Sequence, residues 1–243
     1  MKITTVISCL FAGAFLSGCC SNKQSHAPVT AAVARISGTP CDVKLPGIHF
    51  TKAINGADTL ATADANGEMT FRVGEKQDNF IDPDNKLSNF TAPMLLAKVD
   101  NTKPFTLTAK VTPGFNADLY NAGVLYLYAN DKWWQKFCFE QDERGNHRIV
   151  TVRTIGTSDD NNHDIVTSSW VYMKISSDTR TVASYYSLDK KNWQLVRLYK
   201  NDYPPELWVG ISAQCPMGKG TVDHFGEVTL TQSSVTDFRM GDQ

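Results

Sequence analysis

The sequence has no excess of charge of either sign. It carries 24 Lys and Arg against 25 Asp and Glu, which gives a formal net charge of −1 at pH 7. A protein that binds nucleic acid through its overall field needs a clear excess of basic residues. The composition therefore predicts no nucleic-acid partner.

Long apolar runs are also missing, with one exception at the N terminus. Residues 3–17 form a mostly apolar run that is too short for a permanent transmembrane helix. The run ends in Leu16-Ser17-Gly18-Cys19, and small residues directly before a cysteine are typical of the lipobox of a bacterial lipoprotein signal. The alternative interpretation is an ordinary secretory signal with an incidental cysteine.

The lipobox interpretation predicts where the protein works. Residues 1–18 are a signal peptide, Cys19 carries acyl chains such as palmitate, and residues 19–40 contain a flexible tether rich in Ser, Ala, Thr, Gln and Pro. We therefore expect a lipoprotein of a Gram-negative cell envelope, anchored to a membrane. Whether it faces the periplasm or the cell surface stays open.

The six cysteines form no CxxC motif and no Cys/His group at zinc spacing, so a structural zinc site is not expected. With Cys9 removed and Cys19 lipidated, four remain, namely Cys20, Cys41, Cys138 and Cys215. An oxidising compartment permits disulfides, and we expect Cys41 to pair with Cys215. The alternative is four unpaired thiols.

Helical periodicity is absent, and apolar residues instead recur at every second position. This alternation occurs in residues 105–111, 134–140 and 226–231, and turn signals such as Asn66-Gly67 separate such segments. Many short strands without helices predict an all-β fold. We expect residues 41–243 to form a single antiparallel jelly-roll β-sandwich.

Five segments, in chain order, resemble the hallmarks of one family. Residues 121–140 match a strand, a turn and the pattern W-x-K-x-G-x-E; the other four segments are residues 149–160, 170–175, 186–193 (with Lys190 in place of a glycine) and 209–225. The chain thus resembles the regulation-of-enolase-protein-like family, a domain of unknown function. The resemblance implies a concanavalin A-like jelly roll and no particular activity.

Strand pleating predicts which side chains of residues 134–140 face the core. Phe137 and Phe139 fall on one side, and Trp134, Lys136 and Glu140 fall on the other. The same alternation in two further segments extends the outer set. If the strands are neighbours, one outer face presents Tyr126, Tyr128, Trp134, Lys136, Glu140, Trp170, Tyr172 and Lys174.

Aromatic rings with interleaved charges suit a carbohydrate ligand, because sugar C–H faces stack on rings and hydroxyls bond to charged groups. The favoured function is non-catalytic glycan recognition. Two structural alternatives remain: cross-strand pairs that only stabilise the sheet, or a polar core that loops cover. Two functional alternatives are a glycoside hydrolase or lyase, and a protein-interaction module with an exposed apolar patch.

Two carboxylates are candidates for catalysis. Glu140 and Asp142 share a strand face at a spacing of roughly 7 Å, which glycoside hydrolysis could use. Arg144-Gly145 places Asp142 at the end of a hairpin, so a solvated turn is the favoured interpretation.

An oxygen-rich loop is expected at residues 158–164, where calcium could bind Asp159, Asp160 and Asp164. Residues 82–85 are a second candidate. Neither follows an EF-hand pattern, and solvated loops without a cofactor are the favoured interpretation. No catalytic fingerprint for a serine hydrolase, a P-loop or a dinucleotide site is present.

Overall fold

Two antiparallel sheets make up the fold of residues 35–242, which are the residues that the computed structural model describes. The predicted signal peptide, Cys19 and Cys20 lie outside the described residues, so their roles stay predictions. Within residues 35–242, no helix is long and apolar enough to cross a membrane.

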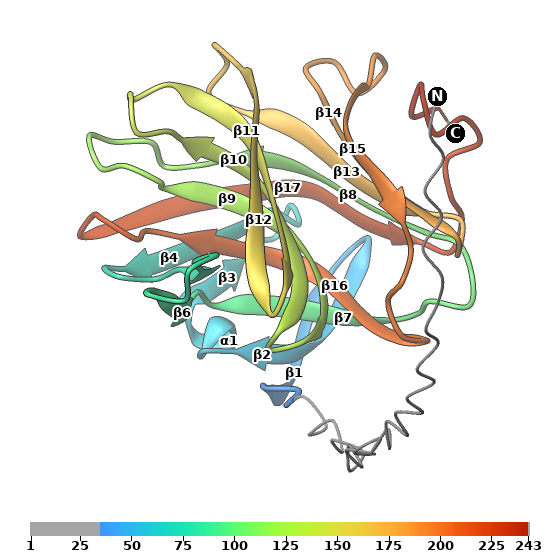
Figure 1. Cartoon of the computed structure of the whole chain (residues 1–243), viewed down its shortest axis with the longest axis horizontal. Helices are drawn as coiled ribbons and strands as arrows, with labels where there is room; N and C mark the ends of the chain where they lie inside the picture. The colour runs from blue at the N-terminus through green and yellow to red at the C-terminus, as the bar shows by residue number, and fades with distance from the viewer. Residues whose placement is uncertain (1–34, 243) are drawn as a thin grey trace, which may run out of the picture. The chain divides into compact units, whose positions relative to one another are not determined.

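The first sheet has eight strands in the order β1-β2-β7-β16-β9-β10-β11-β12 (Figure 1). Their bounds are Thr39–Leu45 (β1), Ile48–Ile54 (β2), Met94–Asp100 (β7), Glu206–Gln214 (β16), Ala122–Asn130 (β9), Trp133–Gln141 (β10), His147–Ile155 (β11) and Thr157–Ile165 (β12). All pairings are antiparallel.

The second sheet has seven strands in the order β15-β14-β13-β8-β17-β4-β3. Their bounds are Gln194–Lys200 (β15), Thr181–Ser187 (β14), Val171–Ser177 (β13), Phe105–Thr112 (β8), Gly220–Thr231 (β17), Met69–Gly74 (β4) and Ala61–Ala63 (β3). One short helix, α1 (Ala57–Leu60), precedes β3. The prediction of an all-β, antiparallel jelly-roll sandwich is confirmed.

The main core lies between the two sheets and follows the predicted pleat. Phe137 and Phe139 point into it from β10, Leu125 and Leu127 from β9, and Leu107 from β8. All five side chains are fully buried. The alternation in the sequence therefore identified the inner face of these strands correctly.

A short hairpin covers part of the outer face of the first sheet. It consists of β5 (Asn79–Ile81) and β6 (Ser88–Phe90). Phe80 and Phe90 of this hairpin pack on a second apolar cluster on the outer face of β9, β10 and β11. Asn79 Nδ2 donates to the Tyr126 hydroxyl at 3.1 Å, which ties the hairpin to the sheet.

The C-terminal segment, residues 232–242, covers part of the outer face of the second sheet. Val235 and Phe238 pack with Tyr185 of β14, whose hydroxyl donates to the Phe238 carbonyl at 2.8 Å. Both outer faces are thus partly buried by a segment that belongs to neither sheet.

The cysteines in the described part of the chain are unpaired. Cys41, Cys138 and Cys215 are free thiols, so the expected Cys41–Cys215 disulfide is wrong. Cys41 Sγ instead lies 3.5 Å from the Phe50 carbonyl, and Cys138 and Cys215 are fully buried. The sandwich is held by packing and strand pairing, since it contains no disulfide between residues 35 and 242.

Candidate functional site

A pocket of about 500 Å³ opens on the outer face of the first sheet, beside the β5–β6 hairpin. We call it the acidic pocket, because four carboxyl groups line it and only one ammonium group does. Those five residues are Asp78, Glu140, Glu143, Asp160 and Lys136. The remaining lining residues are Phe80, Leu87, Asn89, Tyr120, Val150, Val152, Asn162, Gln214, Pro216 and Met217.

A buried polar network forms the floor of the acidic pocket. Lys136 Nζ donates to Asp78 Oδ1 at 3.1 Å and to Gln214 Oε1 at 3.0 Å. Gln214 Nε2 in turn donates to Glu140 Oε2 at 2.9 Å and to the Tyr120 carbonyl at 3.0 Å. One amide thereby connects the ammonium group to the second carboxyl group.

The pleat explains why these side chains meet. Lys136 and Glu140 lie on the outer side of β10, and Gln214 ends β16 on the outer side of the same sheet. Asp78 comes from the residue directly before β5. Three distant parts of the sequence therefore supply the network.

Burial and charge shift the ionisation of the floor in opposite ways. Burial raises the pKa of Glu140 to about 8, against a partial lowering by Lys136, so the carboxyl group is largely protonated at pH 7. Burial alone would lower the pKa of Lys136, but the neighbouring groups, of which the Asp78 carboxylate has the largest effect, together outweigh burial and raise the pKa. At neutral pH the floor holds one ion pair and one neutral acid.

The rim of the pocket is partly apolar and locally strained. Leu87 and Met217 are exposed large side chains at its edge. Tyr120 has a φ of 64°, a left-handed conformation that is uncommon for a bulky residue and costs free energy. The Tyr120 N–H donates to the Gln141 carbonyl and the Tyr120 carbonyl accepts from Gln214 Nε2, and these two bonds hold the residue in place. Such strain is typical of functional sites.

Three aromatic residues of the predicted outer face are not accessible. Tyr126, Tyr128 and Trp134 do lie on the outer side of the first sheet, but all three are fully buried. The hairpin strands β5 and β6 cover them, and the Tyr128 hydroxyl also bonds to Asp131 and to the backbone NH of Ser37. The expectation that they form an open surface is therefore wrong.

Three further members of the predicted set lie on the other sheet. Trp170 precedes β13, and Tyr172 and Lys174 lie on it, and β13 pairs with β8 and β14. The eight residues thus do not share one face. Only Lys136 and Glu140 reach the acidic pocket, whereas Lys174 lines a separate pocket on the second sheet.

Asp142, the second candidate for catalysis, does not line the acidic pocket. Its Oδ1 accepts backbone hydrogen bonds from Arg144 and Asn146, and its Oδ2 accepts one from Arg148 Nε at 3.0 Å. These hydrogen bonds outweigh burial and lower its pKa to about 2. Asp142 organises the turn between β10 and β11.

The expected calcium loop is a strand. Residues 157–165 form β12, at the edge of the first sheet, so their side chains point to both faces. Asp159 accepts from Arg197, Asp164 accepts from the Tyr186 hydroxyl, and Asp160 lines the acidic pocket. In the described part of the chain, no group of three or more His, Cys, Asp or Glu could hold a metal ion. At residues 82–85, Asp84 contacts Lys86 instead.

Several pocket residues were missed in the sequence. Asp78, Phe80 and Tyr120 lie in short strands or loops, where no periodic pattern marks them. Gln214 lies in a segment that the family resemblance covers, but its amide is not a residue type that signals a site. Asp160 was named only as a metal ligand; partial desolvation at the pocket raises its pKa.

Residues 57–233 match the family described as "Protein of unknown function (DUF1349)". The chain belongs to this family. The DUF1349 assignment agrees with the predicted resemblance to a domain of unknown function on a β-sandwich, but it does not test the regulation-of-enolase family name. A comparison with curated proteins finds no match.

Solved structures show the same fold as this DUF1349 chain. A functionally unknown protein from Saccharomyces cerevisiae has a TM-score of 0.67 and 22% identity, over 74% of this chain and 95% of that one. The GH43 BlXynB protein from Bacillus licheniformis has a TM-score of 0.57 and 14% identity, over 76% of this chain and 36% of that one.

Xylan beta-1,4-xylosidase from Bacillus halodurans C-125 has a TM-score of 0.50 and 14% identity, over 68% of this chain and 33% of that one. This chain therefore spans only about a third of the two Bacillus proteins. At these identities the likeness concerns the fold.

Proposed function

We propose that the protein recognises carbohydrate without cleaving it, and that the ligand binds in the acidic pocket. The observation that carries the proposal is the buried Lys136–Asp78–Gln214–Glu140 network on the floor of an otherwise partly apolar pocket. Small-molecule sites typically combine apolar walls with a few converging polar groups. Sugar-active proteins among the similar folds give further support.

The charge of the pocket favours a neutral sugar. Four carboxyl groups face one ammonium group, so the pocket offers more acceptors than donors. Sugar hydroxyls donate to carboxylates, whereas an anionic ligand would be repelled. The side chains of Phe80 and Tyr120 supply ring surface for the C–H face of a sugar.

Binding to a panel of neutral glycans that includes xylan tests this proposal. Tyr120→Asn removes the ring while keeping a residue that tolerates left-handed backbone, and we expect it to weaken binding about tenfold. Phe80→Ala should act in the same direction. Trp170→Ala, on the second sheet, is the control and should leave the dissociation constant unchanged. Equal affinity of Tyr120→Asn and the wild type would contradict the site.

Glycoside cleavage is a second candidate, and the ionisation of Glu140 favours it. A carboxyl group that is protonated at pH 7 can act as a general acid. Glu140→Gln separates the two functions, because the amide resembles the protonated carboxyl group. Recognition alone predicts unchanged glycan affinity and no release of reducing sugar by either protein. Cleavage by the wild type that Glu140→Gln abolishes would establish the enzyme.

We also propose that Cys19 anchors the protein in the envelope of a Gram-negative bacterium. The support is the lipobox Leu16-Ser17-Gly18-Cys19. Two or more acyl chains hold a protein on a membrane stably. Cys19→Ala should therefore move the protein from the membrane fraction to the soluble fraction. Continued membrane association of this variant would contradict the anchor.

A further inference from the structure

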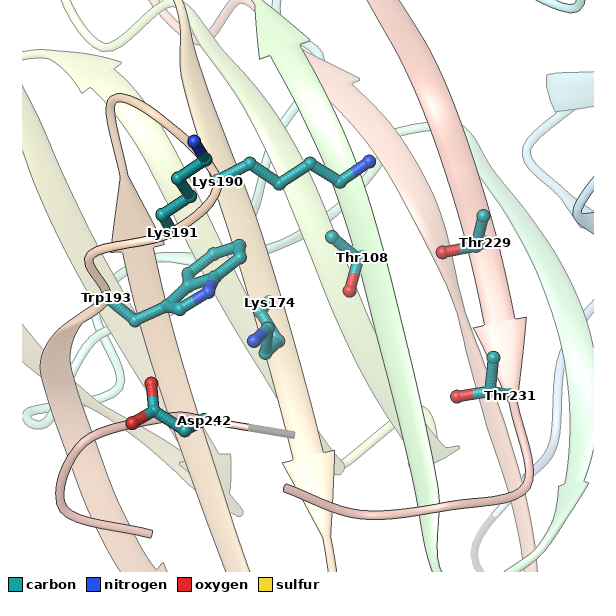
Figure 2. A pocket seen from close by; sticks show the side chains of 8 residues that line it. All are labelled: Thr108, Lys174, Lys190, Lys191, Trp193, Thr229, Thr231 and Asp242. Carbon is teal, nitrogen blue, oxygen red and sulfur yellow. The ribbon is translucent and has the colours of Figure 1, made fainter. Parts of the chain in front are cut away.

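We propose that the second sheet carries an independent site that binds the carboxylate or sulfate group of an acidic saccharide. The site is a pocket of about 520 Å³ on the outer face of this sheet, which we call the basic pocket. Three lysines, three threonines, Trp193 and Asp242 line it (Figure 2). It lies on the opposite sheet from the acidic pocket and does not depend on the proposed function.

Lys174 is the centre of the basic pocket, and its ammonium group has no direct ion-pair partner. The side chain is only 4% exposed, and its Nζ donates to the Gly241 carbonyl at 2.9 Å. Nζ also lies 3.7 Å from the centroid of the Trp193 ring. Asp242 lines the same pocket, but within residues 35–242 no carboxylate lies within ion-pair distance of the Lys174 ammonium group. Because a buried ammonium group without a counter-ion is costly, an incoming oxyanion would gain a strong partner.

The other two lysines extend this positive charge along the rim. Lys190 and Lys191 lie in the turn between β14 and β15, and Figure 2 shows the Lys190 side chain reaching from that turn toward Thr108. Lys190 Nζ pairs with Glu227 at 2.5 Å, whereas Lys191 has no carboxylate partner among the described residues. The pocket therefore offers two ammonium groups that form no direct ion pair among the described residues, beside the single carboxylate of Asp242.

The pocket wall supplies hydroxyl groups in register. Thr108 of β8 pairs with Lys174 of β13 on one side and with Thr229 of β17 on the other. Figure 2 shows the Thr108 side chain on the strand next to Lys174, and those of Thr229 and Thr231 on the strand beyond it. These hydroxyls can donate to an oxyanion or exchange hydrogen bonds with sugar hydroxyls.

Two aromatic side chains beside the pocket, Tyr172 and Trp170, favour a saccharide over a free inorganic ion as the ligand. Tyr172, two residues before Lys174 on β13, is half-buried and stacks edge-on against Trp170 at 5.6 Å. Lys110 lies 4.4 Å from the Trp170 ring, and the Tyr172 hydroxyl donates to Glu227 at 2.8 Å. Ring faces next to cationic groups suit a sugar ring that carries a negative charge.

Isothermal titration at low ionic strength tests the site with three probes: sodium sulfate, oligogalacturonate and dextran sulfate. We expect both saccharides to bind and inorganic sulfate to bind more weakly. Lys174→Met should weaken binding about tenfold or more, because a charge-assisted hydrogen bond is lost. Lys191→Ala, an exposed change that leaves the fold intact, should weaken it by several-fold.

Two control variants show whether binding depends on the basic pocket itself. Lys132→Ala removes an exposed positive charge from the turn between β9 and β10 of the first sheet, outside the pocket lining, and should leave affinity unchanged. Glu140→Gln, in the acidic pocket, should also leave it unchanged, so failure of the proposed function does not affect this test. Undiminished binding by folded Lys174→Met and by Lys191→Ala would overturn the proposal. Binding of inorganic sulfate but of neither saccharide would overturn its saccharide part.

Discussion

The acidic and basic pockets occupy comparable places on the two sheets, but the buried lysine has an ion-pair partner in only the acidic pocket. Each pocket lies beside the segment that covers its sheet, the β5–β6 hairpin on one side and residues 232–242 on the other. Lys136 is matched by the Asp78 carboxylate and the Gln214 amide. Lys174 instead donates to the Gly241 carbonyl and lies over the Trp193 ring, with Asp242 in the same pocket but beyond ion-pair distance.

This difference shows that burial alone does not define a binding group. The network around Lys136 is closed, so a ligand there meets a prearranged floor and adds its own contacts to it. The ammonium group of Lys174 has no direct ion-pair partner, so a negatively charged ligand would supply one. The two faces of one sandwich are thus suited to ligands of different charge.

The largest expected effect comes from breaking the closed network. Asp78→Ala leaves Lys136 buried without its counter-ion, and we expect the free energy of unfolding to fall by about 3 to 5 kcal/mol. Lys174→Met removes a buried charge that has no direct ion-pair partner, so it should leave stability unchanged or raise it. Urea denaturation at pH 7 measures both values.

Asp84→Ala is the control for this pair, because Asp84 forms an exposed ion pair with Lys86 and its loss should have little effect. Equal losses in Asp78→Ala and Lys174→Met would show that the two lysines are equivalent and would remove the contrast.

A smaller effect is an opposite dependence of stability on pH. The pKa of Glu140 is raised from 4.5 to about 8, so its contribution is complete below pH 4.5 and is lost as the pH rises to 8. The pKa of Lys174 is lowered from 10.5 to about 8, so its contribution is complete above pH 10.5 and is lost as the pH falls to 8. The first effect is on the order of 3 kcal/mol and the second roughly 1 to 2 kcal/mol.

Denaturation of each variant and of the wild type across pH 4–11 separates the two effects, because each variant lacks one of the two groups. Glu140→Gln should remove the loss between pH 4.5 and 8, and Lys174→Met should remove the gain between pH 8 and 10.5. Other groups that face them, Lys136, Asp78 and Asp160 on one side and Asp242 and Tyr185 on the other, are unchanged in both comparisons. Curves parallel to the wild type would contradict the assigned pKa shifts.

The smallest expected effect is a difference in salt dependence. Raising NaCl from about 20 to about 200 mM should weaken sulfate and acidic-saccharide binding several-fold, because salt screens the lysine charges. Binding of a neutral glycan to the acidic pocket should stay the same over this range. Titrations of both ligand types at two salt concentrations provide the measurement. The same salt dependence for both ligands would contradict the difference in charge between the two pockets.

The fold was predictable because the pleat leaves a clear pattern in the sequence. Phe137 and Phe139 alternate with Lys136 and Glu140, and this alone assigned the two sides of β10 correctly. Strand β12 was missed for the same reason: its polar residues face solvent or the pocket, so no apolar alternation marks it. A strand is visible in sequence only where one side is buried.

The site was predictable only in part, because pleating does not say which strands are neighbours. The prediction that Lys174 points outward from its own strand was right, but the chain topology places that strand, β13, in the other sheet. The β5–β6 hairpin that covers Trp134 could not be predicted either, because strands of three residues each are too short to show an alternating pattern. Asp78 reaches Lys136 across 58 positions in the sequence, and no local signal reports such a contact.

The acidic composition of β12 has a consequence for solubility. An unpaired strand at the border of a sheet invites the same strand of another molecule to add to it. Charged and amide side chains along β12 disfavour such docking, and the ion pair of Asp159 with Arg197 at 2.7 Å fastens this border to β15 of the opposite sheet. The residues that resembled a metal site thus disfavour the pairing of β12 with a strand of another molecule.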